Sequence, residues 1–331
     1  MAKRYVSFVV FAALAAVGQA QQGQVTGPVL GYVFDGAARA VRPVLGIAGA
    51  SIFGTPMALG YDVTSATVAP GGDSAVALAA DGSVHLLRLS GGQATEMTLN
   101  GASVKPSRVV FSPSGTAVAL VAGGRAQVFG GLPAAATLVG TMDLAGAAAA
   151  SSQAQVQSAR RPAGTAGSAS MALSDDGAWL LAVENGSLEL IGAGGSHAIA
   201  NAGRGALAAF APGGHDAALL DSQQTLTVVR SVDTTAARQV LAANVGMTGA
   251  AGLGFSADGK SLFLAGSGQA MVFDVASGKQ TPVSCNCSAT GLARMGSVYR
   301  LNEPGSGPVW LLDPAAGNPR IVFVPALGSS E

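Results

Sequence analysis

Val109-Val-Phe-Ser-Pro-Ser-Gly-Thr-Ala-Val-Ala-Leu120 is the stretch whose pattern decides the fold of this chain. An apolar run leads into a turn, and a second apolar run follows it. In the turn, proline presets φ and glycine takes the positive φ that a tight hairpin needs. The same pattern recurs in residues 66–78, 171–181, 208–220 and 253–264.

The turn glycines of these five units measure the repeat. Gly72, Gly115, Gly177, Gly214 and Gly259 follow one another at intervals of 43, 62, 37 and 45 residues. Each unit continues through a second turn into a third apolar run with alternating side chains and then a weaker fourth run. The third runs are residues 83–89, 126–129, 187–191, 225–230 and 269–274. Four short antiparallel strands in each repeat of this length predict the blades of an all-β propeller.

The ends of the repeat array decide the number of blades. A sixth unit spans residues 290–324. Residues 33–35 and 43–44 match residues 272–274 and 282–283 at identical spacing, so residues 28–45 are predicted as the outer two strands of a further blade without its inner two. The total is then seven blades, or six if this hairpin belongs to the last unit. The one long interval contains residues 145–170, rich in Ala, Gly, Ser and Gln, which predict a flexible inter-blade loop.

The turns also carry a family resemblance. Ser-Pro-Ser-Gly at 112–115 and Ser-Ala-Asp-Gly at 256–259, each followed by an apolar strand, resemble the turns of WD-repeat-like and YVTN-type propellers of bacterial exported proteins. The likeness covers residues 28–324. The His and Trp-Asp positions of true WD repeats are absent, so their hydrogen-bond network is not carried over. The propeller domain is predicted over residues 28–327, with a tail at 328–331. Propellers host many unrelated activities, so the fold alone assigns none.

The N-terminus predicts export. Lys3 and Arg4 precede the apolar run 5–17, and Gly18-Gln-Ala20 offers small residues for cleavage, so residues 1–20 are predicted as a signal peptide and 21–27 as a linker. Thirteen apolar residues rise only about 20 Å as a helix, short of the roughly 30 Å membrane core. We therefore expect a periplasmic or extracellular protein without a membrane span after cleavage.

The balance of charge excludes one class of partner. The chain has 18 Lys and Arg against 18 Asp and Glu, and loss of the signal removes two of the positive charges. The mature chain is close to neutral and slightly acidic. Binding of nucleic acid depends on a basic surface that neutralises phosphates, so nucleic acid is not an expected partner.

Residues 254–261, Gly-Phe-Ser-Ala-Asp-Gly-Lys-Ser, match the pattern of a phosphate-binding loop. That chemistry needs a helix after the loop, whose N–H groups face the phosphate. Here an apolar strand follows, and four other units have a turn at the same place. We therefore predict a hairpin turn, and no nucleotide or other cofactor.

Cys285 and Cys287 are the only cysteines. An isolated pair in an exported protein favours a disulfide. Their Cα atoms would lie about 6.4–6.8 Å apart in an ideal strand, near the upper limit for bridging, so a bulge or bend is needed. Two free thiols, or use in metal binding or redox chemistry, remain alternatives. A zinc site would need histidines beside them, and none are near in sequence.

The other polar and aromatic residues predict structural roles. His85 lies in a third strand, whereas His197 and His215 lie at turns; a catalytic triad would need Ser and a carboxylate beside one of them in space. No catalytic residue and no metal ligand are predicted. Turn chemistry accounts for the aspartates, which are Asp73, Asp81, Asp175, Asp176 and Asp258. Inter-blade core is predicted for three aromatic residues that share one repeat position, Phe111, Phe210 and Phe255.

The leading functional hypothesis is a monomeric, non-catalytic scaffold or binding module that holds a protein or a glycan on one rim or face. Its Gly-, Ser- and Asp-rich turns suit an extended protein partner. The alternative is a propeller enzyme, such as a lactonase or hydrolase, with ionisable groups from several blades at the central channel. The first strands consist mainly of Ala, Val, Leu and Gly, with Arg108 and Arg294 as exceptions, which favours binding. A purely structural surface component remains a third possibility.

Overall fold

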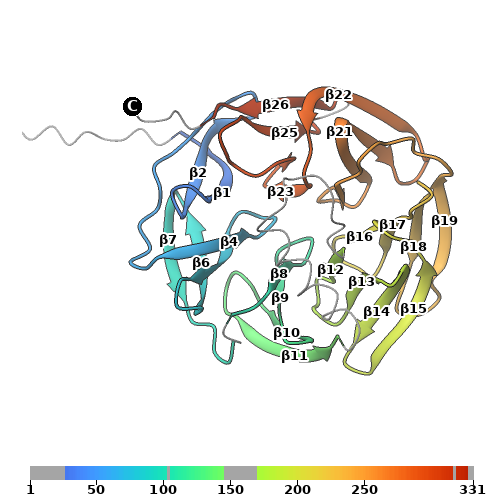
Figure 1. The fold of residues 1–331 in the computed structure, drawn as a ribbon, viewed down its shortest axis with the longest axis horizontal. Helices are drawn as coiled ribbons and strands as arrows, with labels where there is room; N and C mark the ends of the chain where they lie inside the picture. Colours follow the sequence, from blue (N-terminus) through green and yellow to red (C-terminus); the bar gives the residue numbers. More distant parts are fainter. Residues whose placement is uncertain (1–26, 103–104, 145–169, 316–317, 327–331) are drawn as a thin grey trace, which may run out of the picture.

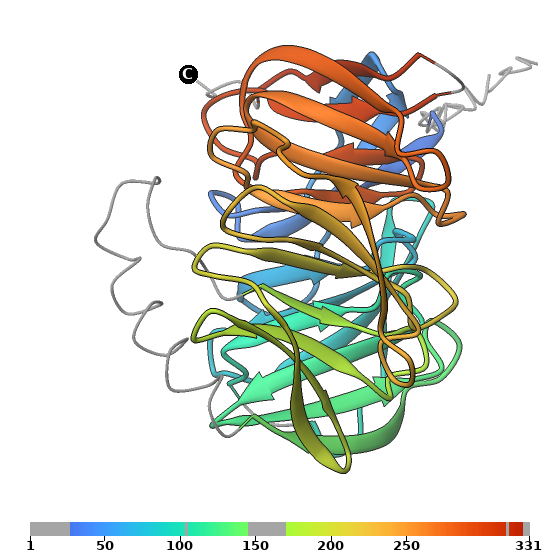
Figure 2. The ribbon, with the colours of Figure 1, turned by 90° about the vertical axis from the view of Figure 1, so that its right-hand side faces the viewer.

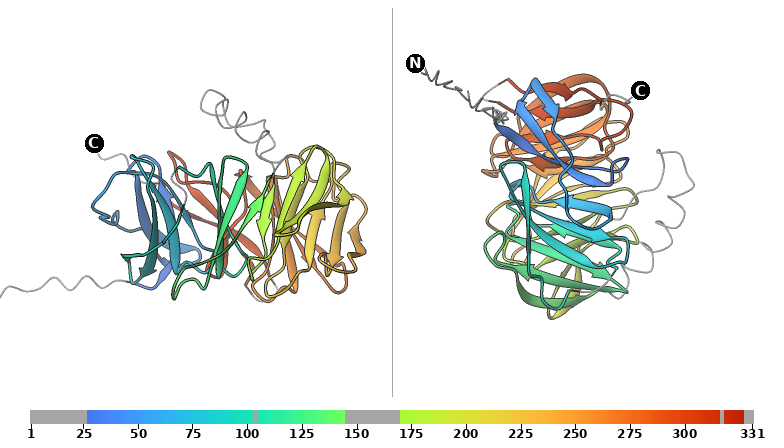
Figure 3. Two further views of the ribbon diagram at one scale, coloured as in Figure 1. Left: turned by 90° about the horizontal axis from the view of Figure 1, so that it is seen from below. Right: turned by 90° about the vertical axis from the view of Figure 1, so that its left-hand side faces the viewer.

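The structure of the chain, a computed structural model, describes residues 27–102, 105–144, 170–315 and 318–326. The predicted signal peptide (1–20), the linker except for its last residue, nearly all of the predicted loop 145–170 and the tail 328–331 lie outside these ranges. All regular elements in the described part are β-strands, and they form seven antiparallel sheets arranged around a central axis (Figure 1). Seen from the side, the strands run between the two faces of a short cylinder (Figures 2 and 3). The predicted seven-bladed propeller is confirmed.

Five blades are plain four-stranded sheets whose strands follow chain order. The blade β4–β7 comprises Val63–Val68, Ser74–Ala79, Val84–Ser90 and Gln93–Met97. The blade β8–β11 comprises Arg108–Phe111, Ala117–Ala122, Arg125–Gly130 and Thr137–Asp143. The blade β12–β15 comprises Met171–Leu173, Leu180–Glu184, Ser187–Gly192 and Gly195–Asn201. The blade β16–β19 comprises Leu207–Phe210, Ala217–Leu220, Leu226–Arg230 and Ala237–Ala242. The blade β23–β26 comprises Ala293–Met295, Val298–Arg300, Val309–Asp313 and Arg320–Val324.

The sixth blade uses one continuous segment for its two middle strands. It consists of β20 (Gly252–Phe255), β21 (Ser261–Asp274) and β22 (Gln280–Ser288). The first part of β21 pairs with β20 and the second part with β22. The amide of Val275 donates to the carbonyl of Lys260 at 2.9 Å, which brings the two ends of β21 together. This segment therefore folds back on itself and supplies both the second and the third strand.

The first blade has its own three-stranded sheet, β1 (Val29–Asp35), β2 (Ala40–Ile47) and β3 (Ala50–Phe53), so the ring has seven blades rather than six. β1 lies beside β4 and β23, the innermost strands of the two neighbouring blades (Figure 1). The prediction that residues 28–45 are outer strands is therefore wrong, and β3 was missed.

The reason for this error lies in the turn. The Asp35 carboxylate accepts the amides of Ala37 and Ala38, and the Asp274 carboxylate accepts the amide of Ser277 in the same way. The shared sequence pattern therefore marks a type of hairpin closure, which occurs at more than one distance from the axis.

The first turn of each blade repeats a small set of hydrogen bonds. The hydroxyl oxygens of Ser112, Ser174 and Ser256 each accept the backbone amide five residues later. The glycines at 72, 115, 177 and 259 have positive φ, whereas in the remaining unit Gly213 takes this role instead of Gly214. The segment that matches a phosphate-binding loop is one of these turns and leads into β21, which confirms the hairpin prediction.

The core lies between the blades. Seven clusters of buried apolar side chains fill the seven gaps, one between each pair of neighbouring sheets. Phe210 and Phe255 are buried in two of these clusters, and the half-buried Phe111 packs against a third. Their predicted inter-blade role is confirmed. Val44 of β2 and Met295 of β23 belong to the cluster that closes the ring.

Candidate functional site

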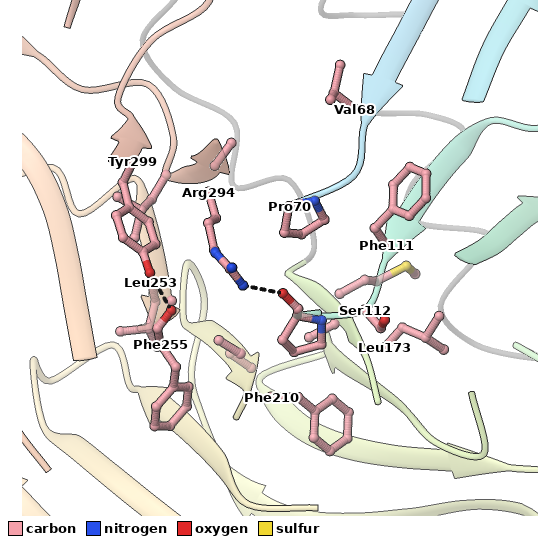
Figure 4. A pocket seen from close by; sticks show the side chains of 18 residues that line it. Val68, Pro70, Phe111, Ser112, Leu173, Phe210, Leu253, Phe255, Arg294 and Tyr299 are labelled. Atoms are coloured by element: carbon pink, nitrogen blue, oxygen red, sulfur yellow. Dashed lines mark hydrogen bonds between the residues drawn. The ribbon is translucent and has the colours of Figure 1, made fainter. Parts of the chain in front are cut away.

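Two adjoining cavities occupy the central channel where the innermost strands end. The first, of about 240 Å³, is lined by residues of β4, β8, β12, β16, β20 and β23 and the turns that follow them (Figure 4). The second, of about 320 Å³, adds β1 and the segment after β24. The two cavities share Val68, Ala293 and Arg294 in their walls. All seven blades therefore contribute to one recess.

Arg294 is the cation of the first cavity. Its Nε donates to the carbonyl of Gly296 at 3.1 Å, and its Nη1 donates to the carbonyl of Pro113 at 3.3 Å (Figure 4). The second bond crosses the channel and joins residues 181 positions apart in the chain. Both acceptors are neutral carbonyl groups, so these bonds hold the guanidinium without balancing its charge.

Tyr299 of β24 stands beside Arg294 in the first cavity. Its hydroxyl donates to the carbonyl of Phe255 at 2.9 Å, and burial raises its pKa to about 12 (Figure 4). The phenol is therefore neutral at physiological pH. Its role is to tie the sixth and seventh blades together beside the recess.

Arg108, the other arginine that stood out in the sequence, is not part of this recess. It is the first residue of β8, whereas Phe111 at the end of the same strand borders the first cavity. Burial lowers the pKa of the Arg108 guanidinium, which still stays charged because an arginine pKa starts far above neutral. The structure therefore does not bring Arg108 and Arg294 into one site.

Asp175 joins three blades on the face formed by the first turns, at residues 69–73, 112–116, 174–178, 211–215 and 256–260; we call this the first-turn face. One carboxylate oxygen accepts the amide and the hydroxyl of Ser114 at 2.8 and 2.6 Å. The other accepts the amide of Gly213 at 2.7 Å. The predicted turn aspartate is thus also an inter-blade tie. The sequence holds no signal for this role because the partners lie 61 and 38 residues away.

His215 makes a second tie on the same face. Its Nε2 lies 2.9 Å from Asp176 Oδ2, and its Nδ1 lies 2.8 Å from Asp233 Oδ2. Partial burial alone would lower the pKa of His215, but its hydrogen bonds to the two carboxylates outweigh burial and raise it. Burial likewise opposes the bonds from Ser174, Ala178 and His215 at Asp176, and the net effect lowers the pKa of that carboxyl.

His85 has a serine and a carboxylate beside it, on the second turn of the β4–β7 blade. Its Nε2 lies 2.8 Å from Ser83 Oγ, and its Nδ1 lies 2.7 Å from Glu96 Oε1. These are the contacts of a Ser-His-carboxylate triad. However, the Ser83 hydroxyl donates its one proton to Asp81 at 2.6 Å, so that proton is directed to a carboxylate and away from the imidazole. The group orders a hairpin, with the Tyr61 ring stacked on the imidazole at 3.9 Å.

The remaining histidine and the other turn aspartates stay local. His197 is exposed on β15. Asp81 accepts the amide of Ser83, and Asp258 accepts the Ser256 hydroxyl and the amide of Lys260, as turn chemistry predicts. Within the described ranges, no group of three or more His, Cys, Asp or Glu side chains is arranged to hold a metal ion.

The two cysteines form a close pair. Their sulfur atoms lie 1.91 Å apart, which is bonding distance, and their Cα atoms lie 5.2 Å apart. The expected bulge is present: Ser284 pairs with Gln269 and Ser288 with Ser267, so three residues on β22 face one on β21. Both side chains pack in the apolar cluster between the sixth and seventh blades.

Comparison with known proteins supports the fold and goes no further. No protein-family model matches the chain, and no curated protein matches it. The structure is similar to the crystal structure of a functionally unknown protein from Desulfotomaculum acetoxidans DSM 771, with a TM-score of 0.55 and 12% identity over 90% of this chain and 100% of that chain. In the part of this chain that the structure describes, no helix is long and apolar enough to span a membrane. The resemblance to WD-repeat-like and YVTN-type propellers stays a prediction, and the chain is a seven-bladed β-propeller.

Proposed function

We propose that this propeller is an exported binding module that holds a protein partner on the first-turn face. The observation that supports this is that hydrogen bonds and ion pairs connect the turns of that face to one another. Asp175 and His215 tie the first turns of three neighbouring blades, and Arg294 of the seventh blade reaches across the channel to Pro113 on one of these turns. The amide of Gly296 adds a bond to the carbonyl of Pro70 at 3.2 Å. A surface already held in one conformation loses little entropy when it binds.

A protein fits this face better than a glycan. The recess at its centre is lined mainly by apolar side chains, among them Leu173, Leu253 and Phe111. An apolar side chain of a protein would bury these surfaces, whereas a sugar would bring hydroxyl groups that need hydrogen-bond partners. The export part of the proposal depends on the signal peptide predicted at residues 1–20.

Site-specific photocrosslinking tests the proposal. A photoreactive amino acid at Ala257, exposed on the first-turn face, should give an adduct with one cell-envelope or secreted protein. The same amino acid at Gln239, exposed on the outer strand β19, serves as the matched control and should not. The protein identified by mass spectrometry should then bind the purified propeller, and an Asp175→Ala variant should weaken that binding.

Three results would replace the proposal. Equal adducts from both positions would move the partner to another surface. Saturable binding on a glycan panel, with no protein adduct, would favour a glycan. Turnover on a panel of lactones and esters that is lost on Arg294→Gln would favour an enzyme at the channel.

A further inference from the structure

The geometry points to a carboxylate-binding site in the channel: Arg294 would pair with a carboxylate carried on an apolar group that fills the adjoining cavity. Because the recess opens on the first-turn face, a carboxylate of the partner is one source, and for that source the inference rests on the proposed function. A free small organic acid is the other source. The shared chemistry is a single negative charge on an apolar body.

In the described part of the chain, the charge of Arg294 has no counter-charge nearby. Among the described residues, no carboxylate lies within ion-pair distance of its guanidinium, whereas Arg300, in the wall of the second cavity, is paired with Glu303. A cation in a recess with apolar walls is costly unless an opposite charge or several hydrogen bonds compensate it. Within the part of the chain that the structure describes, Arg294 therefore brings a positive charge without an ion-pair partner to the first cavity.

The guanidinium of Arg294 is held in one orientation. Its Nε and Nη1 are occupied by the carbonyls of Gly296 and Pro113, and these bonds fix the plane of the group. No described residue accepts a hydrogen bond from the other N–H groups, those of Nη2 included, so in this part of the chain they are available to a ligand. A carboxylate fits such a planar fork, and charge-assisted bonds of this kind are about twice as strong as neutral ones.

The surroundings decide the type of anion. The side chains that line the first cavity are mainly apolar, with Phe111, Leu173 and Leu253 among them and Arg294 as their cation. A phosphate dianion draws several cations or amides, and Arg294 is the one cation among the described residues that line this cavity. A volume of about 240 Å³ is small for a ligand pocket and suits a body the size of one aromatic ring. The arrangement thus favours a monocarboxylate with a compact apolar group.

Calorimetric titration of the full mature chain with phenylacetate tests the inference, with phenylacetamide as the neutral ligand of the same shape. Phenylacetate should bind saturably and at least about tenfold more tightly than the amide, because the amide forgoes the charge-assisted bonds. Arg294→Gln should lose at least about tenfold in affinity, and Arg294→Lys should retain part of it. Arg125→Gln, which removes an exposed arginine that pairs with Asp143, should bind as the unmodified chain does.

A second variant controls for loss of structure in Arg294→Gln, because Arg294 also ties two blades. Leu253→Trp keeps Arg294 and fills the first cavity, and it should abolish binding while the circular dichroism spectrum stays unchanged. Equal affinity for acid and amide, full binding by a folded Arg294→Gln or Leu253→Trp variant, or no saturable binding at millimolar phenylacetate would overturn the inference.

Peptide ligands distinguish the two sources of the carboxylate, a partner protein and a free small acid. Acetyl-Gly-Phe with a free C-terminal carboxylate is compared with its C-terminal amide. If the free peptide and phenylacetate both bind through Arg294, a partner chain can supply the carboxylate; if phenylacetate alone binds, the source is a small acid. Phenylacetate binding without any crosslinked protein would refute the docking proposal and keep the acid site, and the reverse result would refute only the acid site.

Discussion

Val44→Ala tests whether the first blade closes the ring. Val44 is fully buried on β2 and packs in the cluster that joins the first blade to the seventh, with Met295, Val298 and Val309 among its members. Ile47, three residues further along the same strand, is 62% exposed and serves as the control. If the ring closes through this cluster, the buried valine carries stability that the exposed isoleucine does not.

The size of the effect follows from burial. Replacing Val44 by alanine removes two buried methyl groups, worth about 1.6 kcal/mol of transfer free energy at ~0.8 kcal/mol each. The cavity left behind adds to this, for a total of about 2 to 3 kcal/mol. In a chain of this length each kcal/mol lowers Tm by about 2 °C, so Tm should fall by about 4–6 °C. Ile47→Ala should stay within about 0.5 kcal/mol of the unmodified chain.

Thermal and urea unfolding of the mature chain, followed by circular dichroism, measures these differences. A third variant, Val76→Ala, removes an equally buried valine between the second and third blades and calibrates the cost of an internal gap. Val44→Ala should match Val76→Ala. If Val44→Ala behaves like Ile47→Ala while Val76→Ala is costly, the first blade does not seal the ring and the closure is refuted.

The other predictions concern His215, Glu184 and the two cysteines. The pKa of His215 is raised in the folded chain, so its ion pairs stabilise the fold below about pH 6.5, and this stabilisation is lost as the pH rises through the raised pKa. His215→Gln should flatten the dependence of Tm on pH in that window. An unchanged pH profile of Tm would contradict the assignment. Glu184 is buried and its pKa is raised, chiefly by burial, so the fold loses stability as pH rises above about 4.3. Glu184→Gln should raise Tm at neutral pH and leave Tm unchanged in acid. A lower Tm of this variant at neutral pH would count against the assignment. The intact mass of the purified protein should be two hydrogens below that of the reduced chain because the sulfur atoms of Cys285 and Cys287 lie at bonding distance. Full alkylation without reductant would exclude the bridge. Replacing both cysteines by serine should cost little stability, since so short a loop constrains the unfolded chain weakly.

The blade architecture could be predicted from the sequence because its causes are local. Each first turn is closed by bonds within five or six residues, such as the amide of Ala117 to Ser112 Oγ, and positive φ at glycine marks it. Strand alternation has a period of two and is visible in any short window. For the same reason the match of residues 254–261 to a phosphate loop could be assigned to a hairpin. The need for a bulge at Cys285 and Cys287 followed from the length of an extended residue.

Tertiary structure alone decided where the local pieces stand and what they touch. Hairpins of one type occur at several distances from the axis, so the pattern in residues 33–44 could not place β1 innermost. Asp175 meets Ser114 and Gly213, and Arg294 meets Pro113, only once the ring has brought distant turns onto one face. Such contacts depend on the rotation from blade to blade and on the closure of the ring, and no short window of sequence contains either. The candidate site belongs to this class, since its recess exists only where seven innermost strands converge.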